Sequence, residues 1–202
     1  MHVTLYGSVL FLHILTAIVA FMMAAVVHAG LPAMARARDV REMRSWAAIL
    51  HRLEPLFPIA ALLLLGFGAW LVHLSHGEIK FSDGWLLTSL ITLVVVEAIA
   101  GIKLSPKAKL AVRMVEEAAD GPVPDGVRQA GLDPWIWYPS HMATLGFGAV
   151  VFLMAAKPSG AWSPIIAIVG VALGVVAANL QLRALTGKST PTASVRQTEA
   201  AQ

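Results

Sequence analysis

The stretch MHVTLYGSVLFLHILTAIVAFMMAAVVHAGLPAMA (Met1–Ala35) contains no Asp, Glu, Lys or Arg. A helix needs only ~20 apolar residues to cross the hydrocarbon core of a bilayer, so this stretch is long enough for one membrane span. Backbone polar groups cannot remain unpaired in lipid, which makes the α-helix the form expected for it. The opening of the chain therefore predicts a membrane protein.

Four further stretches are free of charged residues, and all but one of them exceed the length of a span. They cover residues 55–77, 84–96, 134–156 and 158–182. The second of these reaches span length only by passing through Glu97. We expect an all-α, polytopic bundle of five transmembrane helices, over about residues 4–29, 50–74, 84–103, 137–156 and 162–184.

The connections expected between these helices differ in length and character. Residues 30–49 and 104–136 are predicted to be loops on one side of the membrane, the second containing an amphipathic helix over about Lys107–Ala119 and then a turn rich in Gly and Pro. Residues 187–202, rich in Ser, Thr, Ala and Gln, are predicted to be a disordered tail.

Composition supports the membrane reading and excludes several other classes. The chain is 57% hydrophobic and 13% charged, with a mean hydropathy of +0.72, whereas soluble domains carry roughly a quarter charged residues. The absence of Cys excludes disulfides, thiolate metal sites and thioether-linked haem. The net charge of +3 comes from basic residues at helix ends, so the partner that we expect is the lipid bilayer and not nucleic acid.

Basic residues alternate between the connecting segments, and this alternation predicts the orientation. In chain order the five segments contain five, one, five, one and three of them: Arg36, Arg38, Arg41, Arg44 and Arg52; Lys80; Lys103, Lys107, Lys109, Arg113 and Arg128; Lys157; and Arg183, Lys188 and Arg196. Segments rich in Lys and Arg stay in the cytoplasm. We therefore expect the N-terminus outside and the C-terminus inside.

Ionisable residues inside membrane spans are costly and are candidates for functional sites. His13, Glu54 and Glu97 lie inside predicted spans, and His28, His51, His73, His76 and His141 lie near span ends. At 100° per residue, His13 shares a helix face with Thr16, Ala17, Ala20 and Ala24. The same rule places His51, Glu54, Pro58, Leu65, Ala69, His73 and His76 on one stripe of the second helix, which we expect to face the bundle.

Depth along the helices separates the histidines into two sets. With a rise of 1.5 Å per residue, His28, His51 and His141 fall near the cytoplasmic boundary, whereas His13, His73 and His76 fall in the outer part. Neutral imidazoles on facing helices can hold haem b or a metal ion. Copper bound with the help of Met side chains is the weaker alternative, because the Met residues are scattered.

The two carboxylates have two readings. Glu54 and Glu97 could carry protons, or they could form structural ion pairs with Arg52 and Lys103, which lie nearby in the sequence. Ala100 and Gly101 follow Glu97 and predict a close-packing face on the third helix.

Other features predict ordinary membrane packing. Gly170 and Gly174 form a GxxxG pair on the fifth helix. Aromatic residues at the ends of the spans predict interfacial belts; they are Trp85, Trp135, Trp137, Tyr138 and Trp162.

Three segments resemble known bacterial membrane families. LHILTAIVAF (Leu12–Phe21) resembles the first-helix signature of copper-resistance D (CopD)-type proteins and of HemJ-like protoporphyrinogen oxidases; LLGFGAWLV (Leu64–Val72) and FLMAAKP (Phe152–Pro158) are similar to segments of these families. The resemblance implies a helical bundle of the bacterial inner membrane with His13 as a haem ligand. The HemJ-like pattern has a Lys in the third span, where this chain has none before Lys103, so the resemblance does not extend to protoporphyrinogen oxidation.

These observations leave three hypotheses. The first is a protein that binds haem b through His13 and a second His and that exchanges electrons with quinone or a partner subunit. His73 and His76 are closer in depth to His13, whereas His28, His51 and His141 would serve an inner haem site. The second is a copper or proton-coupled permease, with His13 and His76 among its metal ligands. The third is a non-catalytic scaffold subunit, and homo-oligomers are compatible with all three.

The orientation can be tested by cysteine labelling. A membrane-impermeant thiol reagent added to intact cells should modify Ser82→Cys, in the segment with one basic residue, and should leave Ser45→Cys unmodified, because that residue lies in a segment with five. Labelling of Ser45→Cys alone would contradict the orientation.

Overall fold

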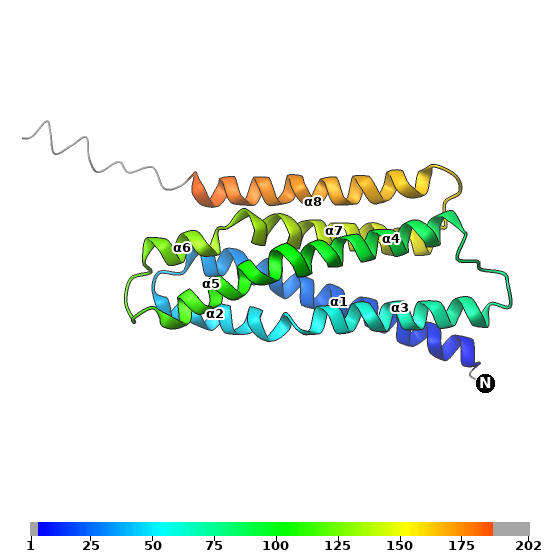
Figure 1. Ribbon diagram of the computed structural model, residues 1–202, viewed down its shortest axis with the longest axis horizontal. Helices are drawn as coiled ribbons and strands as arrows, with labels where there is room; N and C mark the ends of the chain where they lie inside the picture. The colour runs from blue at the N-terminus through cyan, green and yellow to red at the C-terminus, as the bar shows by residue number, and fades with distance from the viewer. Residues whose placement is uncertain (1–3, 188–202) are drawn as a thin grey trace, which may run out of the picture.

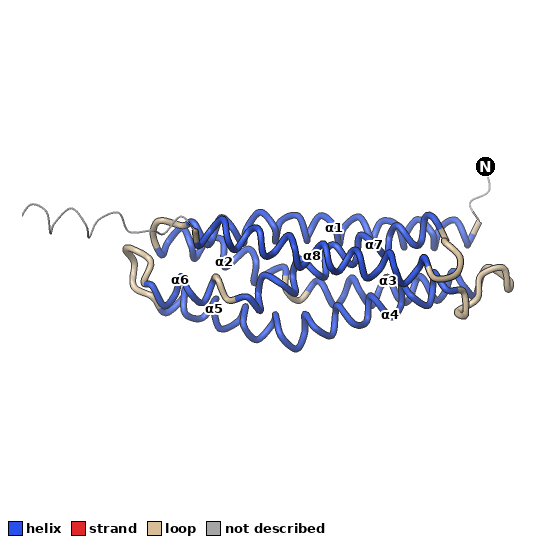
Figure 2. The backbone as a smooth tube through the Cα atoms, turned by 90° about the horizontal axis from the view of Figure 1, so that it is seen from above, coloured by secondary structure: helices blue, strands red, loops and turns tan. Residues whose placement is uncertain are grey.

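The computed structural model describes residues 4–187, and within that range the chain is helical apart from short connections. All helices run along the long axis of the molecule (Figures 1 and 2). The helices are α1 (Leu5–Arg36), α2 (Val40–Leu53), α3 (Leu56–Leu74), α4 (Gly84–Ile99), the π-helix η1 (Ala100–Leu104), α5 (Ser105–Glu117), α6 (Asp125–Gly131), α7 (Pro134–Ala156) and α8 (Trp162–Thr186).

These helices form five rods that are long and apolar enough to cross a membrane, as the sequence predicts. The rods cover Leu5–Arg36, Val40–Leu74, Gly84–Glu117, Asp125–Ala156 and Trp162–Thr186. The all-helical, five-span fold class is thus confirmed. A 32-residue helix such as α1 is about 48 Å long, which exceeds the hydrocarbon thickness of about 30 Å.

Residues 30–49 are helical, in contrast to the loop predicted there. α1 continues to Arg36, and α2 begins at Val40 after Asp39, whose Oδ1 accepts a hydrogen bond from the Glu42 amide at 2.8 Å. In residues 104–136, the helix predicted over about Lys107–Ala119 is present as α5, and α6 adds a second helix where a turn was predicted. The helices extend because their apolar residues continue at helical spacing past the point where a span would end.

A compact apolar core explains these extensions. It lies at the end of the bundle formed by α2, α5 and α6, which we name the α6 end. Its buried members are Met34, Ala37, Val40, Met43, Ala47, Val115, Val123 and Val127. Charged residues surround this core: Asp120 bonds to Arg44 at 3.0 Å and to Arg41 at 3.5 Å. The hydrogen bond from Arg44, assisted by the one from Arg41, lowers the pKa of the exposed Asp120 carboxyl.

α7 and α8 approach each other closely through the GxxxG pair. A Cβ atom on Gly170 would lie 2.6 Å from the Ala149 Cβ, and one on Gly174 would lie 2.7 Å from the His141 carbonyl oxygen. Only glycine permits this distance between the two backbones. The packing role predicted for this pair is confirmed.

The remaining helices divide into two groups. α1 packs against α3, whereas α7 packs against both α8 and α4; we name these the α1–α3 pair and the α4–α7–α8 group. α3 has little contact with α4. The two groups touch in the membrane-spanning part through side chains, such as the Phe21 and Phe147 rings with centroids 4.8 Å apart.

The face that α3 buries differs from the predicted stripe. Its buried residues are Ala60, Ala61, Leu64 and Leu71, whereas Pro58, Ala69 and His73 are exposed. The rod is interrupted at Glu54 and Pro55, between α2 and α3. A helical phase of 100° per residue cannot be carried across that interruption, so only part of this stripe faces the bundle: Leu65 and Ala69 line a cavity there.

Two smaller predictions also fail. Ala100 and Gly101 lie in η1, which buries no residue, and α4 packs instead through residues that include Ser89, Leu93 and Val96. Trp137 is not part of an interfacial belt, because it is 0% exposed and its Nε1 donates to the Gly131 carbonyl at 3.0 Å. Buried indoles need such a partner.

The α7–α8 contact can be tested by adding a methyl group. Gly174→Ala should destabilise the protein by about 1–3 kcal/mol, because the new Cβ meets backbone atoms that cannot rotate away. The measurement is the midpoint of unfolding in an SDS titration. Gly148→Ala is the control, since no atom lies within 4 Å of its added Cβ. Equal midpoints for the two variants would show that α8 is not held at this distance.

Candidate functional site

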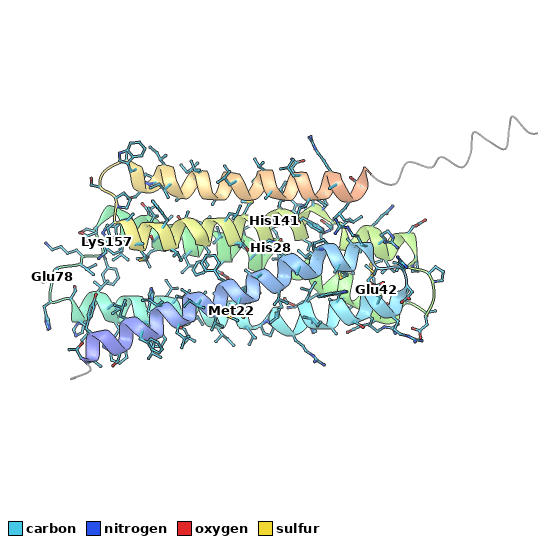
Figure 3. All side chains as sticks on the ribbon, turned by 180° about the vertical axis from the view of Figure 1, so that it is seen from behind. Met22, His28, Glu42, Glu78, His141 and Lys157 are labelled. Atoms are coloured by element: carbon cyan, nitrogen blue, oxygen red, sulfur yellow. The ribbon has the colours of Figure 1, made fainter. Side chains whose placement is uncertain are left out.

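Of the candidate histidines, the structure brings only two together. His28 of α1 and His141 of α7 lie side by side in the middle of the molecule, with ring centroids 4.4 Å apart and planes at 67° (Figure 3). The third member of the predicted inner set, His51, is 52% exposed and lies elsewhere, beside Glu54. We name His28 and His141 the histidine dyad.

The hydrogen bonds of the dyad fix the proton on each ring. The Thr144 hydroxyl donates its only hydrogen to the Ser140 carbonyl at 3.0 Å, so it must accept from His28 Nε2 at 2.8 Å. His141 Nδ1 lies 2.8 Å from the Trp137 carbonyl, which can only accept. His28 therefore carries its hydrogen on Nε2 and His141 carries its hydrogen on Nδ1.

His141 is the more rigidly held of the two rings. It is 4% exposed, and its ring stacks on that of Trp137 at a centroid distance of 6.0 Å. The close approach of Gly174 holds the His141 backbone from the opposite helix. Its Nε2 is buried and has no hydrogen-bond partner. The His141 ring is oriented by a backbone carbonyl and keeps a buried, unused lone pair on Nε2. Metal-ligating histidines have this arrangement, and such a nitrogen could also accept a proton.

His13 occupies a second, separate position nearer the start of α1. Its Nδ1 is buried without a hydrogen bond of normal geometry, although the Leu64 carbonyl interacts with the ring. The ring faces Gly68 of α3, where an added Cβ would lie 3.4 Å from His13 Cε1. Thr16, Ala17 and Ala20 lie half-buried on the same face of α1, and Ala24 is fully buried, as the sequence predicts for this face.

The His13 ring lines a cavity of about 70 Å³ between the two helix groups. The α1–α3 pair contributes Ala17, Leu64 and Gly68 to the wall, and the α4–α7–α8 group contributes residues such as Leu93 and Phe147. Ser89 also lines it, but its hydroxyl donates to the Trp85 carbonyl at 2.7 Å. His13 thus supplies the free polar atom of an otherwise apolar cavity.

Glu54 lies in an ion-pair network at the interruption between α2 and α3. Its Oε1 accepts from the Ser105 hydroxyl and lies 3.4 Å from Lys109 Nζ, and its Oε2 lies 3.6 Å from His51 Nδ1. The structural ion-pair reading therefore applies to Glu54, with other partners than the ones predicted. Lys103 instead lies over the Trp135 ring, 5.3 Å from its centroid.

The side chain of Glu97 has no ion pair or hydrogen bond among residues 4–187. At 100° per residue it continues the stripe formed by Leu86, Leu90 and Leu93, which line the cavity beside His13. It lies one turn further along α4 than Leu93, and η1 begins three residues later. The proton-linked role proposed for Glu97 stays a prediction, as it does for Glu54.

The outer histidines do not join His13. His73 and His76 are exposed at the end where α3 finishes. His76 has φ of 51° and lines an open crevice with Glu78 and Lys157, which lie at the same end of the molecule (Figure 3). In the described part of the chain, no three residues of the types His, Asp and Glu come together as a metal site, and the metal role of His13 and His76 stays a prediction.

Several residues of these sites could not be predicted from the sequence. Thr144 and Trp137 become important only because α1 and α7 lie side by side. The polar face formed by Trp137, Ser140, His141 and Thr144, at helical spacing, was the available signal for the dyad. For Gly68 the available signal was a small residue within LLGFGAWLV. A small residue at this position is explained equally well by ordinary helix packing.

Comparison with known protein families matches residues 8–158 to the family described as "Predicted integral membrane protein (DUF2269)". The matched region contains His13, Gly68 and both members of the dyad. No curated protein and no solved structure matches the chain.

The network around Glu54 can be tested by neutralising it. Glu54→Gln should destabilise the protein by about 1–2 kcal/mol, because Lys109 and His51 lose a half-buried anionic partner. The measurement is the same SDS titration. Glu116→Gln, an exposed carboxylate of α5 outside this network, should change the midpoint little. A neutral result at both positions would mean that the pairs contribute nothing to stability.

Proposed function

The chain belongs to the family of predicted integral membrane proteins DUF2269, and we propose that this member binds haem b beside His13 and takes part in membrane electron transfer. His13 would hold the haem, which would lie between the α1–α3 pair and the α4–α7–α8 group.

The observation that carries the proposal is the buried Nδ1 of His13, which makes no hydrogen bond of normal geometry although the Leu64 carbonyl interacts with the ring. A buried imidazole nitrogen without a hydrogen bond is costly in an apolar environment, so a structural histidine would be expected to have a partner there. A neutral imidazole facing an apolar cavity has the donor chemistry that haem iron uses. The small residues Ala17 and Gly68 on either side of the ring allow a flat molecule to approach closely.

The cavity volume sets a condition on the proposal. About 70 Å³ is a fraction of the space that a porphyrin occupies, so the two helix groups must separate to admit it. Such a movement would break side-chain contacts beside the cavity, such as that between Phe21 and Phe147, while the buried cluster of Leu31, Ala35, Trp137 and Ala178 holds α1 to α7 and α8 nearer the α6 end. α7 and α8 would move together, because their backbones are in close contact.

The chain's own residues would act on the haem in three ways. Haem b supplies one-electron chemistry when bound. His13 would hold the iron and, through its basicity, contribute to the reduction potential. The lining residues Leu64, Leu93 and Phe147 would exclude water from the porphyrin, which also affects the potential.

The remaining parts of the proposal concern the setting of the protein. We propose the bacterial inner membrane, with the α6 end in the cytoplasm, because the basic residues collect there. An electron carrier needs a partner, and quinone in the lipid or a redox subunit would reach the cavity from the side.

The proposal is tested by the reduced-minus-oxidised spectrum of the purified protein, loaded with haem b if necessary. Soret and α-bands should be present in the wild type, and His13→Ala should lose most of the bound haem while remaining inserted. Gly68→Leu should also lose haem, because the new side chain fills the cavity beside His13.

Matched controls are available for both variants. Gly66→Leu lies two residues away on α3, where no atom surrounds the added Cβ, and it should keep its haem. His51→Ala, an exposed histidine, should keep it as well. Full haem content in both His13→Ala and Gly68→Leu would contradict the proposed site, and a wild type that binds no haem would contradict the function.

A further inference from the structure

Lys103 and Trp135 form a contact on the outside of the bundle, where η1 packs against α7. The Lys103 ammonium lies over the Trp135 ring, 5.3 Å from its centroid. Trp135 is 50% exposed, and Ile102 beside Lys103 is 68% exposed. An exposed ammonium held over an indole face keeps its charge and its N–H donors, so it can still bind an anion. The contact thus presents a positive charge next to an apolar surface.

The charge of Lys103 has no carboxylate partner among residues 4–187. Asp133 lies two residues before Trp135, but it is neutralised by Lys107, with an N–O distance of 3.0 Å. The carboxylate that precedes Lys103 on its own rod is Glu97, which is six residues earlier and therefore about 9 Å deeper in the span. The protein itself leaves the charge of Lys103 uncompensated.

A second contact of the same kind lies at the opposite end of the same two rods. The Lys157 ammonium, at the end of α7, lies over the Trp85 ring at the start of α4, 5.4 Å from its centroid. α4 and α7 pack against each other and run in opposite directions (Figure 1). Each rod therefore supplies the indole of one contact and the ammonium of the other.

The separation of the two contacts matches the thickness of a bilayer. Trp85 and Lys103 are 18 residues apart, which corresponds to about 27 Å of helix, and Trp135 and Lys157 are 22 residues apart, which corresponds to about 33 Å. The hydrocarbon core of a bilayer is about 30 Å thick. The two contacts therefore lie at the two headgroup layers, where Trp and Lys side chains of membrane proteins collect.

We propose that Lys103 and Trp135 form a binding site for the headgroup of an anionic phospholipid, such as phosphatidylglycerol. The Lys103 ammonium binds the lipid phosphate. The Trp135 indole N–H, which donates to no acceptor in the described part of the chain, is available to an oxygen of the same headgroup. Ile102 and the exposed part of the indole contact the acyl chains. The site goes beyond the proposed haem function.

The apolar surroundings favour a lipid over a soluble phosphate. A soluble anion would meet only the ammonium and the indole N–H, whereas a phospholipid also removes Ile102 and the indole ring from water. Leu104, next to Lys103, packs against the buried cluster that contains Trp137, so the backbone of this segment is held against α7. The lipid phosphates also lie at the depth of the site, which raises their local concentration there.

The balance of charge makes the Lys103 contact selective and the Lys157 contact unselective. Glu78 lines the same crevice as Lys157, and Asp83 lies two residues before Trp85. Neither carboxylate has an ion-pair partner within the described residues, so both offset the charge of Lys157. At the Lys103 contact the nearby aspartate is already neutralised. We therefore expect a preference for anionic headgroups at the Lys103 contact alone.

The test uses protein labelled with 5-fluorotryptophan in nanodiscs of phosphatidylcholine that contain an increasing fraction of phosphatidylglycerol at constant ionic strength. The ¹⁹F signal of Trp135, assigned with Trp135→Phe, should shift and then saturate. In Lys103→Gln, the midpoint should move to an about fivefold higher fraction of phosphatidylglycerol, the factor that one basic residue contributes to binding anionic lipid. Lys103→Arg should keep the wild-type midpoint, because a guanidinium also binds phosphate and stacks on an indole.

Lys157→Gln is the matched control, because it removes the other ammonium that lies over an indole. It should leave the Trp135 midpoint unchanged, and the signals of the other tryptophans show whether each variant keeps its fold. Inorganic phosphate in solution should not displace the lipid.

Three results would overturn the proposal: a Trp135 signal that does not respond to phosphatidylglycerol, the same midpoint in Lys103→Gln as in the wild type, or displacement by inorganic phosphate, which would indicate a site for a soluble anion. No haem takes part in these measurements, so failure of the haem function and failure of this proposal are distinguishable.

Discussion

The backbone contact between α7 and α8 is the constraint on which both candidate sites depend. Helices in lipid gain little from hydrophobic attraction to one another, so close packing must hold them together. Gly170 and Gly174 allow α8 to approach α7 until it touches the His141 carbonyl. This contact fixes α7, and α7 in turn supplies His141 and Trp137 to the dyad and Phe147 to the cavity wall.

Both sites lie where the α1–α3 pair meets the α4–α7–α8 group. The cavity receives His13 from one group and Phe147 from the other, and the dyad receives His28 and His141 in the same way. The contact between Phe21 and Phe147 lies between the two positions along α1. A boundary made of side chains can open or shift at a lower free-energy cost than one made of interlocked backbones. The apolar core at the α6 end keeps the groups joined while it does so.

Much of this architecture could be predicted from the sequence, because the bilayer imposes strict rules. The length of the uncharged stretches predicted the five membrane-spanning segments. The spacing of Thr16, Ala17 and Ala20 predicted the buried face of α1, and the GxxxG pair predicted the α7–α8 contact. The histidine dyad was harder to predict from the sequence. Depth alone grouped His28 and His141 with His51, since a rise per residue says nothing about which helices are neighbours.

Other errors arose where a helix changes its phase or direction. The interruption at Glu54 and Pro55 rotated α3 relative to α2, so a stripe that was continuous in the sequence was divided in space. The π-helix after Glu97 had the same effect on the predicted packing face of α4. Trp137 was assigned to an interfacial belt because its position near a span end could not reveal the core that covers it.

The haem proposal requires a porphyrin to enter between the two helix groups. Double electron–electron resonance can follow this opening, with spin labels at Leu62 of α3 and Ile168 of α8, which are both exposed on the outside of the bundle. The diamagnetic analogue zinc protoporphyrin IX avoids interference from iron. The account predicts that the distance between the labels increases when the porphyrin binds and that His13→Ala abolishes the change. A distance distribution that stays the same while the porphyrin is bound would contradict it.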